Sequence, residues 1–271
     1  MCALGDLLLD VVVRLPGPLA TGGDVPAETR AGAGGQAANV AAWAVALGGA
    51  GRYLGKRADD AAGAAISAEV EGYGVDLVGP LVPGRTGVVV SIVDAGGERT
   101  MASDRGAATD LRADEVDASW LDGCTALHVS GYSLAREPIA AAAERAAELA
   151  RERGVELSAD VSAATLVDGA FRARLARLAP DVLFANEDER AALGGELEAP
   201  AWALKRGPRG CVFSRDGRRL ELSAPEADVV DSTGAGDALA AGFLLGGSLE
   251  EASRRAMDAA ARCVAKLGSM P

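Results

Sequence analysis

The sequence predicts an α/β protein whose mostly parallel central sheet is covered by helices on both faces. Short apolar runs such as "VELSADV" (155–161) and "DVLFAN" (181–186) alternate with longer helical patterns rich in alanine, such as 137–154. Buried strands that alternate with helices are typical of parallel sheets between two helical layers. The chain has 271 residues, of which 49% are apolar, so it can bury a sizeable core in one main domain.

The individual elements follow from local patterns. Apolar runs predict strands or strand ends at 2–13, 86–94, 125–131, 155–161, 181–186, 201–207 and 210–217. Alanine-rich periodic patterns predict helices at 36–47, 61–74 and 137–154. In the last of these, Pro138 suits the first turn and Gly154 suits the end of the helix.

Two segments interrupt the alternation of strands and helices. Residues 11–32 contain several proline and glycine residues, and residues 85–103 have the pattern of a β-hairpin with "DAGG" (94–97) at its turn. Together they predict a small β lid, near 11–32 and 85–103, on a single domain that spans 1–271. The alternative is that both segments are surface excursions without a function.

The charge and the apolar pattern exclude two classes of partner. The formal net charge of −12 argues against a nucleic-acid partner, because the phosphates would be repelled. Asp6 and Asp10 interrupt the apolar run at the N-terminus, which also lacks the basic flank of a signal peptide. No window approaches the roughly 18 uninterrupted apolar residues of a membrane-spanning helix. We therefore expect a cytoplasmic protein without a membrane partner.

The cysteines give no sign of a metal site. Cys2, Cys124, Cys211 and Cys263 form no C-x-x-C pair and have no neighbouring histidine, so neither zinc nor a disulfide framework is indicated. We expect all four to be reduced. The single histidine, His128, lies in an apolar strand and is interpreted as structural.

The stretch "DSTGAGDALAAGF" (231–243) predicts an anion-binding turn followed by a helix. Gly234 and Gly236 let backbone amides approach a ligand closely. The helix N-terminus adds unpaired N–H groups and a partial positive charge. Asp237 lies in the first helical turn, where its charged form is stabilised and ready to accept a proton from an alcohol. The alternative is that Asp237 only complements the helix dipole. The stretch is not a Walker A loop, because no G-K-[ST] follows.

The stretch "AGAGGQAANVAAWAVALGG" (31–49) predicts a second glycine loop before a helix. Gly32, Gly34 and Gly35 allow hydroxyl groups of a ligand to approach backbone amides, and Asn39 offers both a donor and an acceptor. The alternative is an ordinary glycine loop that leads into an alanine-rich helix. The strict G-x-G-x-x-G spacing and the acid expected near a ribose are missing, which argues against a dinucleotide-binding dehydrogenase.

Together, "GGQAANVAAWAVALGG" (34–49) and "DSTGAGDALAAGF" resemble the two signatures of the ribokinase family, also called the PfkB carbohydrate kinases. Smaller matches at "GERTM" (97–101), "NEDE" (186–189) and "KRGPRG" (205–210) extend the resemblance over almost the whole chain. The resemblance implies a three-layer α/β/α ribokinase-like fold with a small β lid. It also implies an enzyme that phosphorylates an alcohol group with ATP.

The resemblance implies roles for individual positions. Asp237 matches the catalytic base, which takes the proton from the hydroxyl group that is phosphorylated. Gly234, Ala235 and Gly236 match the anion hole, whose amides hold the γ-phosphoryl group during transfer. Substrate binding is implied for Asp10, Gly34, Gly35 and Asn39.

Nucleotide and ion sites are implied in the same way. Asn186 and Glu189 match the N-x-x-E motif, with Asn186 on the nucleotide side and Glu189 holding Mg²⁺ through water. The nucleotide loop is matched by Lys205, Gly207 and Gly210. Part of the family binds a monovalent cation such as K⁺, at the positions that match Asp231, Thr233, Cys263 and Gly268.

The sequence defines the acceptor less well than the reaction. Arg105, in "SDRGA" (103–107), lies where the chain returns from the predicted lid and would suit a carboxylate or phosphate group of a substrate; the alternative is a solvated charge. No aromatic residue of the first signature is placed to stack on a base, since Trp43 is interpreted as core. We therefore expect a sugar or a sugar acid as substrate. The alternatives are a nucleoside kinase on the same fold and a non-catalytic ligand-binding relative, and a homodimer formed through the lid is compatible with the resemblance.

Overall fold

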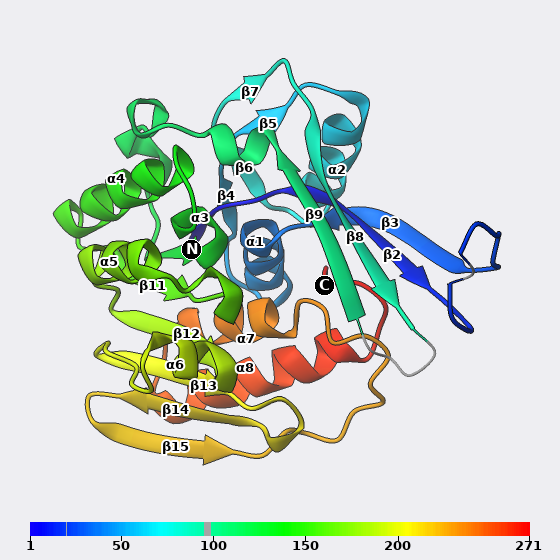
Figure 1. Ribbon diagram of the computed structural model, residues 1–271. Coiled ribbons are helices and arrows are strands. Elements are labelled where there is room, and N and C mark those ends of the chain that lie inside the picture. Colours follow the sequence, from blue (N-terminus) through cyan, green and yellow to red (C-terminus); the bar gives the residue numbers. More distant parts are fainter. Residues whose placement is uncertain (20, 95–98) are drawn as a thin grey trace.

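The computed structural model describes residues 1–19, 21–94 and 99–271 (Figure 1). Its main sheet has nine strands in the order β15-β14-β13-β12-β11-β10-β1-β4-β6. Neighbours from β13 to β6 run parallel, whereas β14 and β15 are added antiparallel at one edge. The strands are β1 (Cys2–Leu4), β4 (Arg52–Leu54), β6 (Asp76–Val78), β10 (Ala126–Ser130), β11 (Glu156–Asp160), β12 (Val182–Asn186), β13 (Ala201–Lys205), β14 (Cys211–Arg215) and β15 (Arg218–Leu222).

Helices cover both faces of this sheet, and each face has its own hydrophobic core. On one face lie α1 (Gln36–Ala46), α2 (Ala61–Gly72), α7 (Ala235–Leu244) and α8 (Leu249–Val264), which bury aromatic residues such as Trp43 and Phe243. On the other face lie α3 (Gly131–Leu134), α4 (Ile139–Glu152), α5 (Gly169–Leu178) and α6 (Glu187–Leu193), around Leu127 and Phe171. The predicted three-layer α/β/α arrangement with a mostly parallel sheet is confirmed.

A separate four-stranded sheet extends from the main body at the right of Figure 1. Its strands are β2 (Leu8–Arg14), β3 (Glu28–Gly34), β8 (Thr86–Val93) and β9 (Arg99–Gly106), in the order β3-β2-β8-β9. We call this the lid sheet. Both segments that interrupted the strand–helix alternation contribute to it. The "DAGG" turn lies largely outside the described residues, which stop at Asp94 and resume at Arg99. A further small sheet pairs β5 (Arg57–Ala58) with β7 (Leu81–Val82).

The run 2–13, predicted to form strands or strand ends, divides between two sheets. The chain forms β1 in the main sheet, leaves it at Gly5, and enters the lid sheet as β2. A Cβ atom on Gly5 would lie 2.8 Å from Cβ of Ser130, so glycine is needed where the chain crosses β10. A continuous apolar run hides this break, because buried strands of both sheets are apolar and periodicity does not separate them.

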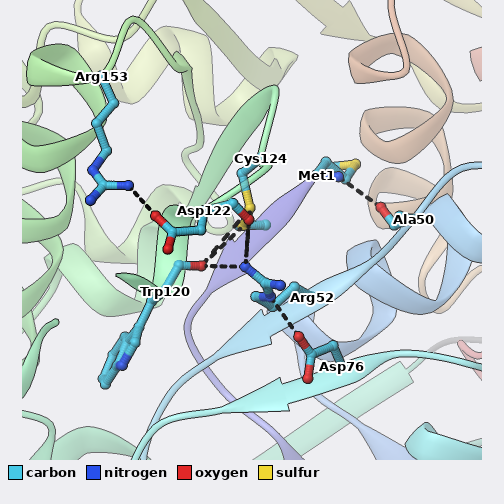
Figure 2. Close-up of a disulfide and its surroundings, with 9 residues drawn as sticks. Met1, Ala50, Arg52, Asp76, Trp120, Asp122, Cys124 and Arg153 are labelled. Atoms are coloured by element: carbon cyan, nitrogen blue, oxygen red, sulfur yellow. Dashed lines mark hydrogen bonds and ion pairs between the residues drawn. A yellow bond between two sulfur atoms is a disulfide. The ribbon is translucent and has the colours of Figure 1, made fainter. Parts of the chain in front are cut away.

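The expectation of four reduced cysteines is wrong, because Cys2 of β1 forms a disulfide with Cys124, just before β10. Figure 2 shows this disulfide beside Arg52, whose guanidinium donates to the carbonyl oxygens of Trp120 (2.8 Å) and Asp122 (3.0 Å). The two cysteines are 122 residues apart in the sequence, and only the pairing of β1 with β10 brings them together. Cys211 and Cys263 are free and buried.

We expect the Cys2–Cys124 disulfide to stabilise the protein. After unfolding without reductant, two thiols should titrate, from Cys211 and Cys263, and four after reduction. Cys124→Ser should lower the free energy of unfolding by about 2–4 kcal/mol, because the unfolded chain loses a cross-link over a long loop. Cys211→Ser is the control for losing a thiol alone. Four titratable thiols without reductant would contradict the disulfide.

The helices and the single histidine can also be compared with the sequence-based expectations. Within the described residues, no helix is long and apolar enough to cross a membrane. His128 is fully buried in β10, where Nδ1 lies 3.0 Å from Oγ of Ser158, and burial lowers its pKa to about 4. Its ring also packs edge-on against Phe184 at a centroid distance of 5.9 Å, which agrees with the interpretation of His128 as structural.

Candidate functional site

Several parallel strands end at one edge of the main sheet, where a cavity of about 580 Å³ opens. The ends of β11, β12 and β13 carry Asp160, Asn186 and Lys205, and Tyr132 follows β10; all four line the cavity. The opposite wall comes from the lid sheet. In open α/β sheets, ligands bind outside the carboxyl ends of the strands, so this edge is the first place to look for a site.

A second cavity, of about 420 Å³, lies against the first. Its walls are mostly apolar. They include Pro208, Pro225, Leu239, Met257 and Val264. The two cavities share Lys205, Gly207, Ser232, Ala235 and Gly236. A polar and an apolar compartment therefore meet at the N-terminus of α7.

The N-terminus of α7 has the conformation that the glycines require. Gly234 is the N-cap residue with a φ of 78°, and a Cβ there would lie 2.6 Å from Cβ of Ser269. Ala235 and Gly236 form the first turn and line both cavities. The first amides of a helix have no partner within it, and the dipole favours an anion there. Part of the predicted anion hole, Ala235 and Gly236, thus lies at the junction of the two cavities, and the predicted base follows it in the chain.

Asp237 lines the larger cavity beside this turn. Nδ2 of Asn39 donates a hydrogen bond to its Oδ2 at 2.7 Å. Burial raises the pKa of Asp237 to about 7, the charge of Asp160 adds to the rise, and the hydrogen bond from Asn39 and the charge of Lys205 oppose it. A carboxylate with a pKa near neutrality suits the work of a general base.

A buried ionic cluster lines the larger cavity, and its lysine, Lys205, also lines the smaller one. Nζ of Lys205 lies 2.6 Å from Oδ2 of Asp160 and 4.0 Å from Oε2 of Glu189. Burial alone would lower the pKa of Lys205, but the charges of Asp160 and Glu189 outweigh it and raise that pKa. Burial raises the pKa of Glu189, and Lys205 partly offsets the rise. The lysine therefore stays charged and is fixed in position beside Gly236.

Asn186 and Glu189 form a reciprocal cap at the start of α6. The amide of Glu189 donates to Oδ1 of Asn186 at 2.8 Å, and the amide of Asn186 donates to Oε2 of Glu189 at 2.7 Å. Nδ2 of Asn186 also donates to Oε1 of Glu189 at 2.9 Å. Both carboxylate oxygens of Glu189 thus already accept N–H groups, which suits contact with a metal ion through water rather than direct ligation.

Glu187 and Asp188 line the same part of the cavity and add hard oxygen donors. Among the residues that the structure describes, no group of three or more His, Cys, Asp or Glu side chains is arranged to hold a metal ion. Magnesium commonly needs only one or two carboxylates together with phosphate oxygens and water. The residues present therefore fit Mg²⁺ that arrives with a nucleotide.

The lid sheet places Asp10 across the cavity from these groups. Asp10 lies inside β2, and it lines the cavity. Gly34 faces it from β3, where a Cβ would lie 2.7 Å from Cβ of Asp10; it supports Asp10 without lining the cavity itself. Gly35 does line the cavity, and a Cβ there would lie 2.5 Å from the carbonyl oxygen of Asp6.

Arg105 is not a solvated charge. Its side chain is 14% exposed, forms an ion pair with the buried Asp6, and stacks 3.7 Å from the ring centroid of Tyr132. These contacts fix the guanidinium at the wall of the cavity. A fixed guanidinium still has N–H groups for an anion in its plane.

The four positions matched to a monovalent cation site do come together, behind the N-terminus of α7. The amides of Thr233 and Gly268 each donate to the carboxylate of Asp231 at 2.9 Å, and Sγ of Cys263 lies 3.2 Å from the carbonyl oxygen of Thr233. Of the nucleotide loop, Gly207 lines both cavities and Gly210 lines the apolar one.

Several cavity residues were missed from the sequence. Asp160 had a usable signal, because an acid at the carboxyl end of a buried parallel strand belongs at this edge. Gln36 lay inside a recognised motif without an assigned role. Nothing local marked the cavity residues Tyr132, Ser162 and Ser269, whose roles depend on contacts with distant segments.

The family model of the pfkB carbohydrate kinases matches residues 1–271. An ATP-dependent ribose-1-phosphate kinase of Halopiger xanaduensis is 32% identical, over 96% of this chain and 88% of its own. Fructokinase-1 of Zea mays is 30% identical, over 89% of this chain and 81% of its own. The crystal structure of adenosine kinase from Sinorhizobium meliloti matches with a TM-score of 0.88 and 27% identity, over 100% of this chain and 95% of its own. The resemblance drawn from the two signatures is confirmed, and the chain belongs to the PfkB family of carbohydrate kinases.

Proposed function

We propose that the protein transfers the γ-phosphoryl group of ATP to a hydroxyl group of a small sugar or sugar acid, with Asp237 as the general base. The observation that carries this proposal is the position of Asp237 beside the first amides of α7, where the polar and the apolar cavity meet. A phosphoryl donor in one cavity and an alcohol in the other would meet at this point.

The chain's own residues account for the chemistry. Asp237 takes the proton of the acceptor hydroxyl as its oxygen forms a bond to the γ-phosphorus, and the bond to the leaving ADP breaks. The amides of Gly234, Ala235 and Gly236 donate to the phosphoryl oxygens, on which negative charge is concentrated. Lys205 adds a fixed positive charge at the shared wall.

The apolar cavity is the proposed site of the adenine end of ATP. Gly207 and Gly210 line this cavity, and Asn186 lines the polar cavity, in which the phosphates would lie. Glu189 would hold Mg²⁺ through water, and this ion would neutralise charge on the β- and γ-phosphates. We also propose a monovalent cation such as K⁺ near Asp231, Thr233, Cys263 and Gly268, because an ion there would stabilise the turn that leads into the anion hole.

Asp10 and Arg105 are the proposed determinants of the acceptor. Asp10 would accept hydrogen bonds from sugar hydroxyls, and Gly35 and Asn39 line the same wall. Arg105 would bind a carboxylate or phosphate of the acceptor, which agrees with a relative that acts on ribose 1-phosphate. Among the described residues that line the cavity, Tyr132 is the only aromatic one, and Arg105 covers its ring. In this part of the chain a nucleoside, the substrate class of the adenosine kinase, therefore meets no uncovered ring to stack on.

A panel of acceptors tests the substrate class. We expect the highest kcat/KM for a sugar that carries a phosphate or carboxylate, ahead of neutral pentoses, hexoses and nucleosides. Arg105→Met alone would leave Asp6 buried without its partner, so the informative variant is Asp6→Asn/Arg105→Met, with Asp6→Asn as its control. Against the control, this variant should lose about 10–100-fold in kcat/KM for the anionic sugar, with neutral sugars unaffected.

An equal loss on neutral and anionic sugars would overturn the role of Arg105 in substrate choice. Turnover on no acceptor in the panel, despite nucleotide binding, would favour a non-catalytic relative. Each acceptor should be assayed with and without K⁺, so that a requirement for the monovalent cation is not mistaken for a lack of activity on that acceptor.

Two wider properties remain proposals. A homodimer is supported by the outer face of the lid sheet, where Val11, Val13, Val90 and Ile92 are only half-buried and point away from the cavity by strand alternation. A cytoplasmic location is supported by the use of ATP as the phosphoryl donor.

A further inference from the structure

Two amide side chains, Asn39 and Gln36, stabilise the charged form of Asp237, and each amide accepts a hydrogen bond from a serine hydroxyl. Oγ of Ser269 donates to Oδ1 of Asn39 at 3.0 Å, and Nδ2 of Asn39 donates to Asp237 at 2.7 Å. Oγ of Ser162 donates to Oε1 of Gln36 at 2.6 Å. The Gln36 side chain lines the cavity with Asp237 and lowers the pKa of that carboxylate. Two serine–amide pairs from separate parts of the chain thus converge on one carboxylate.

One further contact bears on the direction of the Ser162 hydrogen bond. The amide of Gly131 donates to Oγ of Ser162 at 2.9 Å, so the hydroxyl proton points toward an acceptor. The nearer acceptor is Oε1 of Gln36 at 2.6 Å, and the carbonyl oxygen of Asp160 lies at 3.3 Å. An amide group has its acceptor and its donors on opposite sides. Because a serine occupies the oxygen of each amide, each NH₂ group is turned toward Asp237. A flipped amide would instead place its carbonyl oxygen against the carboxylate.

The backbone at Ser162 is unusual. Its φ of 72° is one of three positive values for non-glycine residues in the described chain. Its amide donates to Oδ1 of Asp160 at 2.8 Å, which holds the turn after β11. Strained backbone is maintained where surrounding contacts define it, and it is often found at functional sites. At Ser162 this conformation places the hydroxyl between Gly131 and Gln36.

We propose that Ser162 and Ser269 are positioning residues for Asp237, and that they act by preventing Gln36 and Asn39 from flipping. This proposal rests on the proposed function, in which Asp237 is the base. Two fixed N–H donors stabilise the ionised carboxylate and leave its remaining lone pairs for the acceptor hydroxyl. The serines touch neither substrate nor phosphate in this role.

The pH profile of kcat tests the proposal. Ser162→Ala and Ser269→Ala should each move its acid limb upward by about one pH unit, because a released amide no longer favours the ionised base. At the high-pH plateau kcat should stay near that of the parent protein. Gln36→Leu should give the same shift as Ser162→Ala. The double variant Gln36→Leu/Ser162→Ala should shift the limb little further, since both changes break the same chain of contacts.

Two controls separate positioning from packing. Ser162→Gly relieves the strained φ but also loses the hydroxyl, so it should shift the profile as Ser162→Ala does. Ser253→Ala removes a hydroxyl that is buried in α8 without a hydrogen-bond partner in the described chain, and it should leave the profile in place. An unchanged acid limb in Ser162→Ala and Ser269→Ala would overturn the proposal. If Asp237→Asn kept full turnover, the assignment of the base would fail, whatever the serine variants did.

Discussion

Asp237→Asn should lower kcat by about 10³-fold, because an amide cannot take the proton of the acceptor hydroxyl and general bases contribute on this scale. The KM values for ATP and acceptor should change little, since asparagine keeps the size of the side chain. Steady-state kinetics on the best acceptor of the panel, together with nucleotide binding measured by calorimetry, check both statements. Full turnover in this variant would contradict the mechanism.

The parent protein should show the matching pH dependence. With a pKa of about 7, Asp237 is increasingly protonated below neutrality, and kcat should fall about tenfold for each pH unit on that limb. The limb should be absent from the residual activity of Asp237→Asn. A limb centred near pH 4 would indicate a base with an ordinary carboxylate pKa.

Stability should respond in the opposite direction. Burial raises the pKa of Asp237 from 3.8 to about 7, so between these values the folded protein binds more protons than the unfolded chain. The contribution of Asp237 to stability therefore falls as the pH rises through this window, and its full cost is present above pH 7. Asp237→Asn should then unfold at a higher temperature than the parent protein at pH 8, as expected for a strained functional group.

If Asp237 only complemented the helix dipole, Asp237→Asn would affect stability but not kcat. An acidic residue in the first turn of α8 provides the matched control. Glu250 lies in the first turn of α8, outside both cavities. Glu250→Gln should leave kcat unchanged and lower the free energy of unfolding only slightly, through the helix dipole and the exposed ion pair with Arg218. If Asp237→Asn behaved like Glu250→Gln, the carboxylate would only complement the dipole.

Local sequence patterns were sufficient to predict most strands of the main sheet. They fail where one apolar run of the sequence contributes strands to two different sheets. The strands from β10 to β14 and the helices α1, α2 and α4 lie where apolar periodicity places them. The run 2–13 divides between two sheets at Gly5, which local periodicity does not reveal. The Cys2–Cys124 disulfide depends on the neighbouring positions of β1 and β10, and sequence spacing alone carries no such information.

The candidate site divides in the same way. Asp237 and the glycines of α7 could be proposed from the sequence, because their predicted chemistry depends on one short stretch. The contacts around them could not, since the hydrogen bonds of Ser162 to Gln36 and of Ser269 to Asn39 join segments more than 100 residues apart. Arg105 shows the difference most clearly: its position at the cavity was expected, but its ion pair with Asp6 and its stacking on Tyr132 require the folded chain.

Lys205→Met should have the largest effect on stability. Asp160 is 1% exposed and Glu189 is 3% exposed, so loss of the lysine leaves two buried carboxylates close together without a cation. Removal of one partner from a buried ion pair costs about 3–5 kcal/mol of unfolding free energy. The loss should be measured by denaturant unfolding at pH 7. Because Lys205 also lines both cavities, the KM for ATP should rise in any variant that still folds.

Lys205→Met/Asp160→Asn separates the structural from the functional part of this effect. Replacing Asp160 by its neutral counterpart removes one unpaired charge, so the double variant should recover much of the stability that Lys205→Met loses. The raised KM for ATP should persist, since the fixed positive charge beside Gly236 is still missing. Recovery of both properties would mean that Lys205 serves only to neutralise Asp160. Equal stability of Lys205→Met and the parent protein would mean that water, rather than the lysine, compensates the two carboxylates.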